Sequence, residues 1–406
     1  MDRLTDVKSG VEVPPSLRWD GSTEAGSIAA DGNYFFTLSA KDDNGNAAVS
    51  PRYEVALDNT APEITVEVPS DPLRILSPDG DGNKDTFSIN QTGSVEELWT
   101  AGIFDGAGTK VRNLDIRNAA PAPFIWDGKD DTGKVVPDGV YKYQIESTDR
   151  ALNSGSGSLD NIIVNTEKPR VSLLIDEAYF SPNGDEVKDT LLLKPDIPVK
   201  DGIVSWTIKI EDQSGTLKRT ISGTKTAPQR QDFDGKDDAG RVLSEGSYRA
   251  LLSVVYQNGN NAVASSPSFS IDLTAPSAAS RADFAAFSPN GDGKQDEMII
   301  RQEGSDEAAW RGEIRRAEAV DGKGVLYKTF HFSGIPSASI SWDGKDENGR
   351  LAGDGDYEYR LISTDKAGNT GSSKSARFSL STADTLSLSP QIIASSPPMA
   401  MALRIA

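Results

Sequence analysis

Three loops of the sequence place acidic and amide side chains at a spacing that could hold a metal ion. Each loop reads Asp/Asn-Gly-Asp-x-x-x-Asp, and the candidate ligands are Asp79, Asp81 and Asp85, then Asn183, Asp185 and Asp189, then Asn290, Asp292 and Asp296. Calcium binds about six to eight oxygen atoms from carboxylates, amides, backbone carbonyls and water. A bound cation also removes the free-energy cost of gathering uncompensated carboxylates. Calcium is therefore the cofactor that this pattern indicates, with further ligands coming from elsewhere in the domain.

The same loops are also well suited to form tight turns without any ion. Proline fixes φ, glycine accepts positive φ, and Asp or Asn side chains bond back to the main chain. This interpretation leaves unexplained why a third carboxylate recurs in every copy. It is strongest for the second loop, where Glu186 and Val187 replace a glycine and a polar residue. The sequence predicts a turn in each loop and leaves open whether calcium closes it.

The composition argues against catalysis. The chain has no cysteine and one histidine, His331, which excludes thiol nucleophiles, disulfides and Cys-rich zinc sites and leaves no histidine pair for a catalytic triad. A second acidic group follows the Trp-Asp-Gly motif, as at Asp127, Asp130 and Asp131, but a lysine partly neutralises it and Asp-Gly steps are ordinary turn signals. A glycosidase needs two carboxylates facing each other across a sugar-binding cleft. Because the acids lie in turn-forming loops that recur along the chain, we expect no enzyme.

The net charge limits the partners of the protein. The formal net charge is -19, from 42 Lys plus Arg against 61 Asp plus Glu. An acidic surface repels phosphate backbones, so we expect no nucleic-acid partner. No apolar run approaches the ~18 residues that span a bilayer, and the first residues lack the apolar core of a secretory signal. We therefore expect neither a transmembrane segment nor a signal peptide within this chain.

The loops belong to a larger repeat that must position them. A Trp-Asp-Gly or Phe-Asp-Gly motif recurs at steps of about 107 residues, at Trp19, Trp126, Phe233 and Trp342. At a fixed distance after each motif come a tyrosine and an asparagine, which are Tyr34 and Asn46, Tyr141 and Asn153, Tyr248 and Asn260, and Tyr357 and Asn369. Internal repetition of this kind indicates a chain of similar domains.

The repeat register divides the chain into units. We predict complete domains at 60–165, 166–273 and 274–380, joined by short proline-containing linkers, and an irregular tail at 381–406. Residues 1–59 contain only the C-terminal half of a unit. Half a sandwich exposes unpaired strand edges and cannot close its core. We therefore expect that the chain as given lacks its true N-terminus.

Strand signals dominate within each unit. Segments are short, β-branched or aromatic, and Tyr141, Tyr143 and Ile145 alternate with polar residues as one buried face of a sheet requires. About seven short strands per unit predict an immunoglobulin-like sandwich, so the fold class is all-β with tandem immunoglobulin-like β-sandwich domains. The six tryptophans recur at fixed places and are expected in the cores.

The motifs resemble known bacterial modules. The segment WDGKDDTGKVVPDGVYKYQIESTD, from Trp126, resembles the Ig-like domain of the flagellar hook-capping protein. The FSPNGDG loop is similar to the start of gliding-motility-associated C-terminal domains, and the motifs DxAGN and DxTAP are similar to tandem bacterial Ig-like surface repeats. Together the resemblances cover residues 16–380. They imply an extracytoplasmic location, in the periplasm, on the cell surface or in a secreted protein.

These observations lead to one main functional hypothesis and two alternatives. We expect a non-enzymatic spacer or adhesin-like module, stiffened by calcium if the loops bind it, within a longer polypeptide that supplies neighbouring domains. Its binding partner, a protein or a cell surface, is not identified by the sequence. The alternatives are accessory domains of a larger secreted enzyme and an appendage-assembly scaffold of the hook-cap type.

Overall fold

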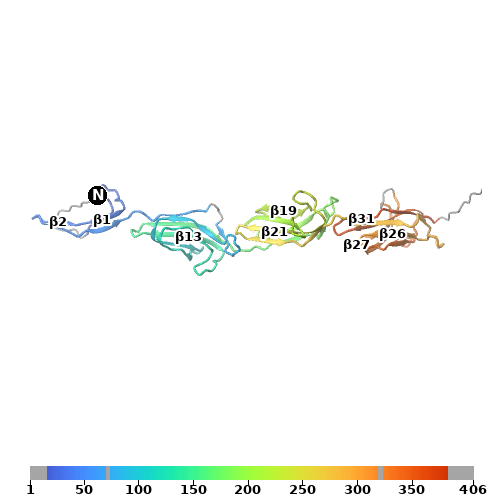
Figure 1. Ribbon diagram of the computed structural model, residues 1–406, viewed down its shortest axis with the longest axis horizontal. Coiled ribbons are helices and arrows are strands. Elements are labelled where there is room, and N and C mark those ends of the chain that lie inside the picture. Colours follow the sequence, from blue (N-terminus) through green and yellow to red (C-terminus); the bar gives the residue numbers. More distant parts are fainter. Residues whose placement is uncertain (1–15, 70–73, 319–322, 383–406) are drawn as a thin grey trace, which may run out of the picture.

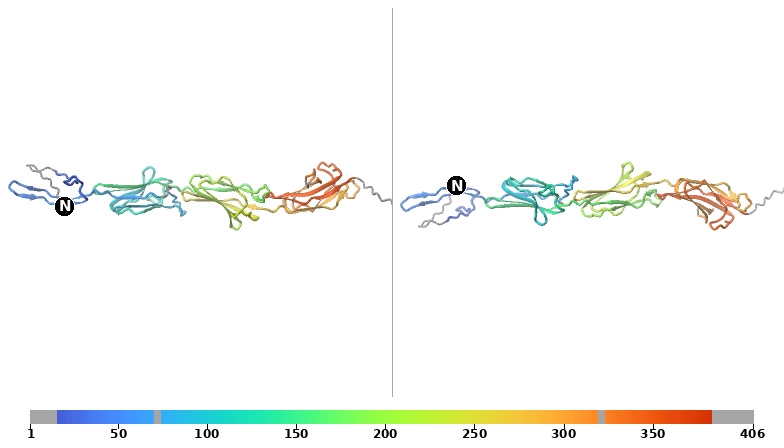
Figure 2. Two further views of the ribbon diagram at one scale, coloured as in Figure 1. Left: turned by 90° about the horizontal axis from the view of Figure 1, so that it is seen from above. Right: turned by 90° about the horizontal axis from the view of Figure 1, so that it is seen from below.

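The computed structural model describes residues 16–69, 74–318 and 323–382. Within them the secondary structure is all-β, without a helix. Figure 1 shows four bodies following one another in a row, in the order of the sequence, and the views in Figure 2 show the same extended arrangement. We call them the first unit (16–59), repeat 1 (60–165), repeat 2 (166–273) and repeat 3 (274–380). The predicted tail at 381–406 lies almost entirely outside the described residues.

The first unit consists of two antiparallel strand pairs. β1 pairs with β4 and β2 pairs with β3, and these strands are β1 (Gly32–Phe36), β2 (Ser39–Lys41), β3 (Ala47–Val49) and β4 (Tyr53–Leu57). Its aromatic residues are partly exposed, and Trp19 retains 39% of its surface. Trp19 still packs on Tyr34, with ring centroids 4.9 Å apart. The expectation that every tryptophan is buried is therefore wrong for Trp19, because no second sheet covers it among the described residues.

Repeat 1 is a sandwich with a six-stranded sheet in the order β10-β9-β13-β14-β6, to which β11 adds by pairing with β9. Two further strand pairs, β12-β7 and β5-β8, lie outside that sheet. The strands are β5 (Ile64–Val66), β6 (Ile75–Leu76), β7 (Phe87–Ile89), β8 (Gln91–Gly93), β9 (Glu96–Phe104), β10 (Lys110–Asn113), β11 (Ile116–Ala119), β12 (Phe124–Trp126), β13 (Gly139–Thr148) and β14 (Ser154–Val164).

Repeat 2 repeats this plan with a six-stranded sheet, β16-β23-β21-β18-β19 plus β22, and a three-stranded sheet, β15-β17-β20. The strands are β15 (Ser172–Ile175), β16 (Tyr179–Phe180), β17 (Leu191–Asp196), β18 (Ile203–Asp212), β19 (Leu217–Thr224), β20 (Gln231–Phe233), β21 (Gly246–Tyr256), β22 (Asn261–Ser265) and β23 (Phe269–Ile271).

Repeat 3 has the corresponding sheets, β25-β32-β30-β27-β28 plus β31, and β24-β26-β29. The strands are β24 (Ala278–Ala282), β25 (Ala286–Phe287), β26 (Met298–Gly304), β27 (Glu307–Arg316), β28 (Leu326–Gly334), β29 (Ser339–Trp342), β30 (Gly355–Thr364), β31 (Thr370–Ser372) and β32 (Ala376–Leu380). Within the described residues, the complete repeats thus have nine or ten short strands rather than the predicted seven or so.

Each complete repeat has its own apolar core. In repeats 1 and 3 the two tryptophans are at most 1% exposed, while Trp206 of repeat 2 is 7% exposed. Phe233 takes the place of a tryptophan and packs edge-on against Phe180, with ring centroids 5.9 Å apart. The prediction that these aromatic residues form cores is confirmed for the complete repeats.

The recurring tyrosine explains part of the repeat register. The Tyr141 hydroxyl donates to the Pro137 carbonyl at 2.7 Å, and Tyr34, Tyr248 and Tyr357 each donate to the carbonyl four residues earlier. This contact is the tyrosine corner of immunoglobulin-like sandwiches. It fixes the entry into the strand that precedes the turn with the repeating asparagine.

One parallel strand pair positions the acidic loops. The short strand β6 pairs in parallel with the end of β14, and β16 and β25 pair in the same way with β23 and β32. Each acidic loop follows directly on this short strand, while the linker to the next unit follows directly on its partner. The loop and the outgoing linker therefore lie side by side at one end of each sandwich.

Candidate interaction site at the joints between repeats

Acidic loop 1 (residues 77–85) is a tight turn held by its own carboxylates. The Asp85 carboxylate accepts hydrogen bonds from the backbone N–H of Gly80 at 2.7 Å and of Gly82 at 2.8 Å. Asp79 and Asp81 each accept one from the amide two residues later, at 3.1 and 2.7 Å. The two glycine amides lower the pKa of the Asp85 carboxyl below its usual range.

Loops 2 (181–189) and 3 (288–296) have the same geometry. Asp189 accepts from the amides of Gly184 and Glu186 at 2.6 and 2.7 Å, and Asp296 accepts from Gly291 and Gly293 at 2.7 and 2.8 Å. The amide residues and central aspartates, Asn183, Asp185, Asn290 and Asp292, accept the remaining short-range amide bonds. The third carboxylate that turn chemistry left unexplained thus has a structural role, because it closes the turn by accepting two backbone amides.

Loop 1 also brings three carboxylates together as a metal site requires. Asp79, Asp81 and Asp85 each offer one oxygen atom, and these atoms lie within 4.8 Å of one another. One ion at about 2.4 Å from each oxygen would satisfy that spacing. The Asp79 side chain is 5% exposed, and its Oδ2 atom lies 3.2 Å from Lys168 Nζ without a hydrogen-bond partner. In loops 2 and 3 an asparagine replaces the first aspartate, so the three candidate ligands carry two negative charges instead of three.

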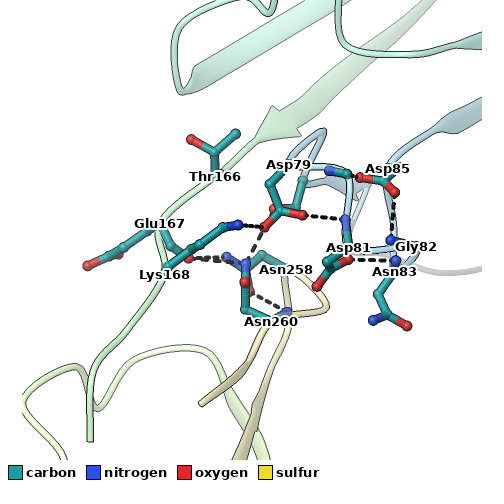
Figure 3. Close-up of polar contacts among 12 residues, drawn as sticks. Asp79, Asp81, Gly82, Asn83, Asp85, Thr166, Glu167, Lys168, Asn258 and Asn260 are labelled. Carbon is teal, nitrogen blue, oxygen red and sulfur yellow. Dashed lines mark hydrogen bonds and ion pairs between the residues drawn. The ribbon is translucent and has the colours of Figure 1, made fainter. Parts of the chain in front are cut away.

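Loops 1 and 2 face the next repeat, which the sequence did not indicate. At the joint between repeats 1 and 2, Ser77 is 1% exposed and its Oγ accepts a hydrogen bond from Asn260 Nδ2 at 3.3 Å. Asn260 Nδ2 also contacts the linker carbonyl of Glu167 at 3.2 Å, and Asn258 Nδ2 donates to the same carbonyl at 2.9 Å. Figure 3 shows loop 1, the linker and the Asn258–Asn260 turn meeting at this point.

The joint between repeats 2 and 3 uses the same parts. The Ser181 hydroxyl, in a residue with no exposed surface, donates to Asn369 Oδ1 at 2.6 Å, and Asn183 Nδ2 lies 3.2 Å from the same oxygen. Asn369 Nδ2 donates to the linker carbonyl of Asp272 at 2.9 Å. Lys188 Nζ donates to a carbonyl of the facing turn, that of Lys366, at 3.1 Å. One asparagine therefore joins the loop of one repeat, the linker and the next repeat.

Glycine precedes this asparagine for a structural reason. Gly259 and Gly368 have φ angles of +92° and +97°, which L side chains rarely adopt. A Cβ atom at Gly368 would lie 2.8 Å from a methyl carbon of Val187 in loop 2, and one at Gly259 would lie 3.1 Å from the Asn83 carbonyl in loop 1. The Gly-Asn pair lets the turn approach the loop closely.

The outgoing linker is clamped by an acid in each unit. Asp138 accepts hydrogen bonds from the Thr166 amide and hydroxyl at 3.0 and 2.8 Å. Glu245 makes the corresponding contacts with Leu273 and Thr274 at 2.8 and 2.6 Å. In the first unit, Asp31 accepts from Asn59 and Thr60, and these bonds lower its pKa. The clamp sets the direction in which the linker leaves the sandwich.

The acidic residues after each Trp/Phe-Asp-Gly motif accept hydrogen bonds from backbone amides of the same repeat. Asp131 accepts from the Asn113 amide at 3.0 Å, and Asp238 and Glu347 accept from the amides of Thr220 and Thr329 at 3.0 and 2.6 Å. Asp130, Asp237 and Asp346 close the hairpin turn that follows the motif. These residues order loops within a repeat and do not meet the acidic loops in a shared site.

Sequence reasoning missed the joint although parts of its signal were visible. The repeating asparagine was recognised only as a register mark, and the serine of the Ser-Pro motif received no role. The clamp acid also stands directly before a recurring glycine, at Asp31, Asp138, Glu245 and Asp354. The pairing of Ser77 with Asn260 could not be found, because it joins different repeats.

The fold and the joints define the chain as a tandem array of immunoglobulin-like β-sandwich domains. Residues 74–151 match the family model described as the FlgD Ig-like domain, which confirms the resemblance for that part of the chain. The likeness of the acidic loops to gliding-motility domains stays a prediction. No helix in the described part of the chain is long and apolar enough to cross a membrane.

Among curated proteins, the chain is similar to C5a peptidase of Streptococcus pyogenes, at 29% identity over 182 residues. The match covers 39% of this chain and 15% of the peptidase, so the chain spans only a small part of the relative's length. The similarity therefore concerns one region of a much longer protein.

Solved structures of tandem modules are also similar. A tetra-tandem repeat in the extending region of a large adhesion protein is 20% identical, with a TM-score of 0.30. The match covers 88% of this chain and 84% of that chain. A structure that concerns the host cell surface retention of a 1.5-MDa bacterial ice-binding adhesin is 15% identical, with a TM-score of 0.35. The match covers 79% of this chain and 98% of that chain. Fibronectin(III)-like modules of Clostridium thermocellum CbhA are 11% identical, with a TM-score of 0.28 and coverages of 52% and 94%. These likenesses concern the fold alone.

Proposed function

We propose that this chain is a rigid stalk segment of an exported bacterial protein, and that its role is mechanical reach rather than catalysis. The observation that carries the proposal is the joint, in which Ser77 and Asn260, and again Ser181 and Asn369, are locked across successive repeats. A spacer with free linkers would need no buried polar contact between its domains. A stalk that must keep its direction needs one at every step.

The strength of the joint comes from the burial of its hydrogen-bonded groups rather than from the size of the contact between the repeats. Each buried hydrogen bond contributes about 0.5–1.5 kcal/mol, and leaving one partner unsatisfied costs about 1–3 kcal/mol. A repeat that swings away from its neighbour exposes these groups to water, so the cost of bending is modest. Because the linker holds the two halves at high effective concentration, modest contacts are sufficient to keep the joint closed.

The absence of an enzymatic role is proposed from the site chemistry. The carboxylates that could have formed catalytic pairs accept backbone amides within their own turns, as Asp85, Asp189 and Asp296 do. Such acids are fixed as hydrogen-bond acceptors of the main chain. The chain supplies a single histidine, His331, and no thiol. These features support a structural module.

An extracytoplasmic location is part of the proposal. The Ig-like modules that these repeats resemble occur mostly in the periplasm, on the surface or in secreted proteins. The similarity to one region of C5a peptidase supports a place within a longer polypeptide. We propose that neighbouring domains of that polypeptide, and not the repeats themselves, contact the unidentified protein or cell-surface partner.

Calcium binding is proposed for loop 1, and more weakly for the loops that contain Asn183 and Asn290. The spacing of the three carboxylate oxygens within 4.8 Å supports it. An ion there would displace or share the contact that Lys168 makes with Asp79. Since the loop touches the next repeat, calcium would stiffen the joint as well as the turn.

A second candidate function is an accessory role in a larger secreted enzyme. The similarity over 182 residues to a peptidase favours it, because that match covers 15% of the peptidase. The two candidates differ in what the complete polypeptide contains beyond these repeats. A catalytic domain next to the repeats supports the accessory role, and further repeats or a membrane anchor support the stalk.

Distances across a joint test the rigid stalk directly. The chain has no cysteine, so spin labels attach only at introduced ones. Val140 and Val263 are 52% and 68% exposed and lie on either side of the joint between repeats 1 and 2, which makes Val140→Cys/Val263→Cys a suitable pair. Pulsed electron double resonance should give one narrow distance distribution, which Asn260→Ala should broaden. A broad distribution in the parent would contradict a rigid joint.

A further inference from the structure

Repeat 3 carries four arginines on the outer face of its six-stranded sheet. Arg311 and Arg315 lie in β27, Arg360 lies in β30 and Arg377 lies in β32. They alternate along the strands with residues of the apolar core, such as Ile314, so they point away from that core. Counted from the tryptophan of the long strand and from the recurring tyrosine, the positions of the first three hold other residues elsewhere, which are Thr100, Phe104 and Gln144 in repeat 1 and Thr207, Glu211 and Leu251 in repeat 2. This arginine face therefore belongs to repeat 3 and not to the fold that the repeats share.

Two buried glutamates hold the arginines in place. Glu313 is 5% exposed, and its carboxylate oxygens lie 2.5 Å from Arg311 Nε and 2.7 Å from Arg315 Nε. Glu358 is 1% exposed, and its Oε2 atom lies 3.6 Å from Arg377 Nη2. The side chains of Arg311 and Arg377 are 55% and 51% exposed. The negative charges thus lie beneath the guanidinium groups, and the middle of this face presents positive charge to solvent on a protein of net charge -19.

The two exposed arginines are too far apart for one small anion. The strand order β32-β30-β27 places Arg377 two strands away from Arg311. Arg377 pairs with Glu358 and Arg311 pairs with Ile362, which is four residues further along β30. At about 4.8 Å per strand and about 3.4 Å per residue, the two are separated by roughly 10 Å across the sheet and roughly 14 Å along it. A ligand that contacts both must be an extended chain with recurring negative charges.

We propose that the arginine face binds an acidic polysaccharide whose sugar units carry carboxylates. A planar guanidinium group binds a carboxylate through two parallel N–H donors. Arg311 and Arg377 would contact separate carboxylates of one polymer chain. Arg315 and Arg360 add positive charge, while one of their nitrogen atoms donates to the Gly324 carbonyl and to the Ser372 hydroxyl, respectively.

The polymer would bind along the side of the stalk. The strand β30 runs from Gly355, next to the clamp residue Asp354, to Thr364, next to the turn that contacts loop 2. The strands of this sheet therefore run from one end of repeat 3 to the other, and the arginine face is lateral. The contact is separate from the protein or cell-surface partner of the neighbouring domains.

The residues around the arginines favour a polysaccharide over a protein. A protein interface draws most of its affinity from apolar and aromatic anchors near its centre. The outward residues paired with the arginines include two apolar ones, Leu326 and Ile362, and β27 with its charged residues lies between them. The strands β27, β30 and β32 are interior strands of the sheet, so they offer no edge to which a peptide could add.

Charge also limits the ligand. Two copies of this chain, each with a net charge of -19, repel one another. DNA carries one charge per about 1.7 Å of helix axis, which is much closer than the spacing of the exposed arginines, and its dense charge is repelled by the rest of the protein. A polysaccharide with at most one carboxylate per sugar unit has a lower charge density and suits the wider spacing.

Electrophoresis of the full chain in native gels that contain polygalacturonate, without calcium, tests this proposal. The polymer should retard the parent, and more at low than at high salt because salt screens exposed charges. Arg311→Gln/Arg377→Gln should lower the affinity about ten-fold. Arg241→Gln/Arg249→Gln is the matched control, since it also removes two positive charges and these side chains of repeat 2 are 80% and 51% exposed. The control should bind like the parent.

A second variant keeps the test decisive if the glutamine variant does not fold. Arg311→Lys/Arg377→Lys retains both charges but loses the paired donors, so its affinity should fall between those of the parent and the glutamine variant. A lysine variant that binds like the parent would overturn the proposal. The same holds for a parent that the polymer does not retard, or for equal losses in the control and the glutamine variant.

Two other polymers identify the ligand class. Polyglutamate or dextran sulfate that retards the parent where polygalacturonate does not would assign the face to an acidic peptide or to a sulfated polymer, and would overturn the carboxylated polysaccharide. Each of these results leaves the rigid stalk unaffected, because Arg311 and Arg377 make their contacts within repeat 3.

Discussion

At the scale of single residues, the asparagine that ends the hairpin turn in repeats 1 to 3 donates a hydrogen bond to a carbonyl of the preceding linker. Asn369 accepts the Ser181 hydroxyl and donates both to Asp365 within its turn and to the Asp272 carbonyl of the linker. Asn153 has the same contacts with Asp149 and with the Asp58 carbonyl at 2.9 and 3.1 Å. An amide suits this position because it offers a donor and an acceptor without a net charge.

Replacing this asparagine should weaken the joint measurably. Asn369→Ala leaves the buried Ser181 hydroxyl without its acceptor and the Asp272 carbonyl without its donor, which should cost about 1–3 kcal/mol. We expect a lower melting temperature for the transition of repeat 3, followed by calorimetry on the full chain. Asn348→Ala is the matched control, because Asn348 is exposed in a hairpin turn of the same repeat. Equal effects of both substitutions would argue against a special role of Asn369.

Calcium and turn chemistry can be separated at Asp81. Asp81→Asn keeps a side-chain oxygen that can accept the Asn83 amide, but it removes a charge that an ion needs. Calcium at about 100 times its dissociation constant would stabilise the folded state by ~2.7 kcal/mol. We therefore expect calcium to raise the melting temperature of repeat 1 in the parent and not in the variant, with a chelator as reference. If calcium does not change the melting temperature of the parent, loop 1 is a turn that binds no calcium.

Acid should loosen the chain, because several carboxylates are held ionised by hydrogen bonds. Bonds from Asn153 lower the pKa of Asp149, and bonds from Thr274 lower that of Glu245, from ordinary values of 3.8 and 4.5. A lowered folded pKa gives stability that is fully present above the unfolded value and is lost as the pH falls through the folded value. Melting temperatures should thus decline as the pH falls below about 4. A melting temperature that stays constant from neutral pH to well below that range would be the contrary result.

At the scale of elements, the linkers that enter repeats 1 and 3 lie so close to a strand that the strand has a glycine at the point of contact. A Cβ atom at Gly371, in β31, would lie 1.8 Å from the Pro276 carbonyl, and one at Gly155, in β14, would lie 1.9 Å from the Pro62 carbonyl. Repeat 2 has Ala262 at the corresponding place, so a glycine occupies this position in repeats 1 and 3 but not in repeat 2. The glycines therefore adapt the strand to the linker.

Adding a methyl group at Gly371 should displace the linker and weaken repeat 3. Overpacking of this kind costs about 1–3 kcal/mol, so Gly371→Ala should lower the melting temperature of that repeat. Gly353→Ala is the control, because nothing lies within 4 Å of its added Cβ and its φ angle is ordinary. Removing backbone freedom there should be neutral or stabilising by up to about 1 kcal/mol. If both variants melt alike, the close approach of the linker has no energetic consequence.

The elements of each repeat could be predicted from the sequence, whereas the joint could not. The alternation around Tyr143 identified a long strand with one buried face, and the structure has β13 there. Strand signals are local, so they survive in a single sequence. The joint depends on contacts between residues 183 positions apart, such as Ser77 and Asn260, and on a shared approach of loop, linker and turn. No local pattern encodes that approach, although the residues involved recur in register.

At the scale of the whole molecule, the number of repeats in a row determines how far the protein extends. A domain of about 107 residues has a radius of gyration near 13 Å, so the array should extend on the order of 100 Å. Figure 2 shows the repeats following one another without folding back. The net charge of -19 opposes contacts between distant repeats and favours the extended form. The joints hold successive repeats of this extended chain in a fixed relative orientation.

Small-angle X-ray scattering of the full chain, beside Asn260→Ala/Asn369→Ala, tests the central claim most directly. If the polar joints keep the stalk straight, the parent should scatter as a single elongated rod. The double variant should show a shorter maximum dimension and a flexible profile while each repeat stays folded. A parent that already scatters as a flexible string, with a profile that the double substitution does not change, would contradict the rigid stalk.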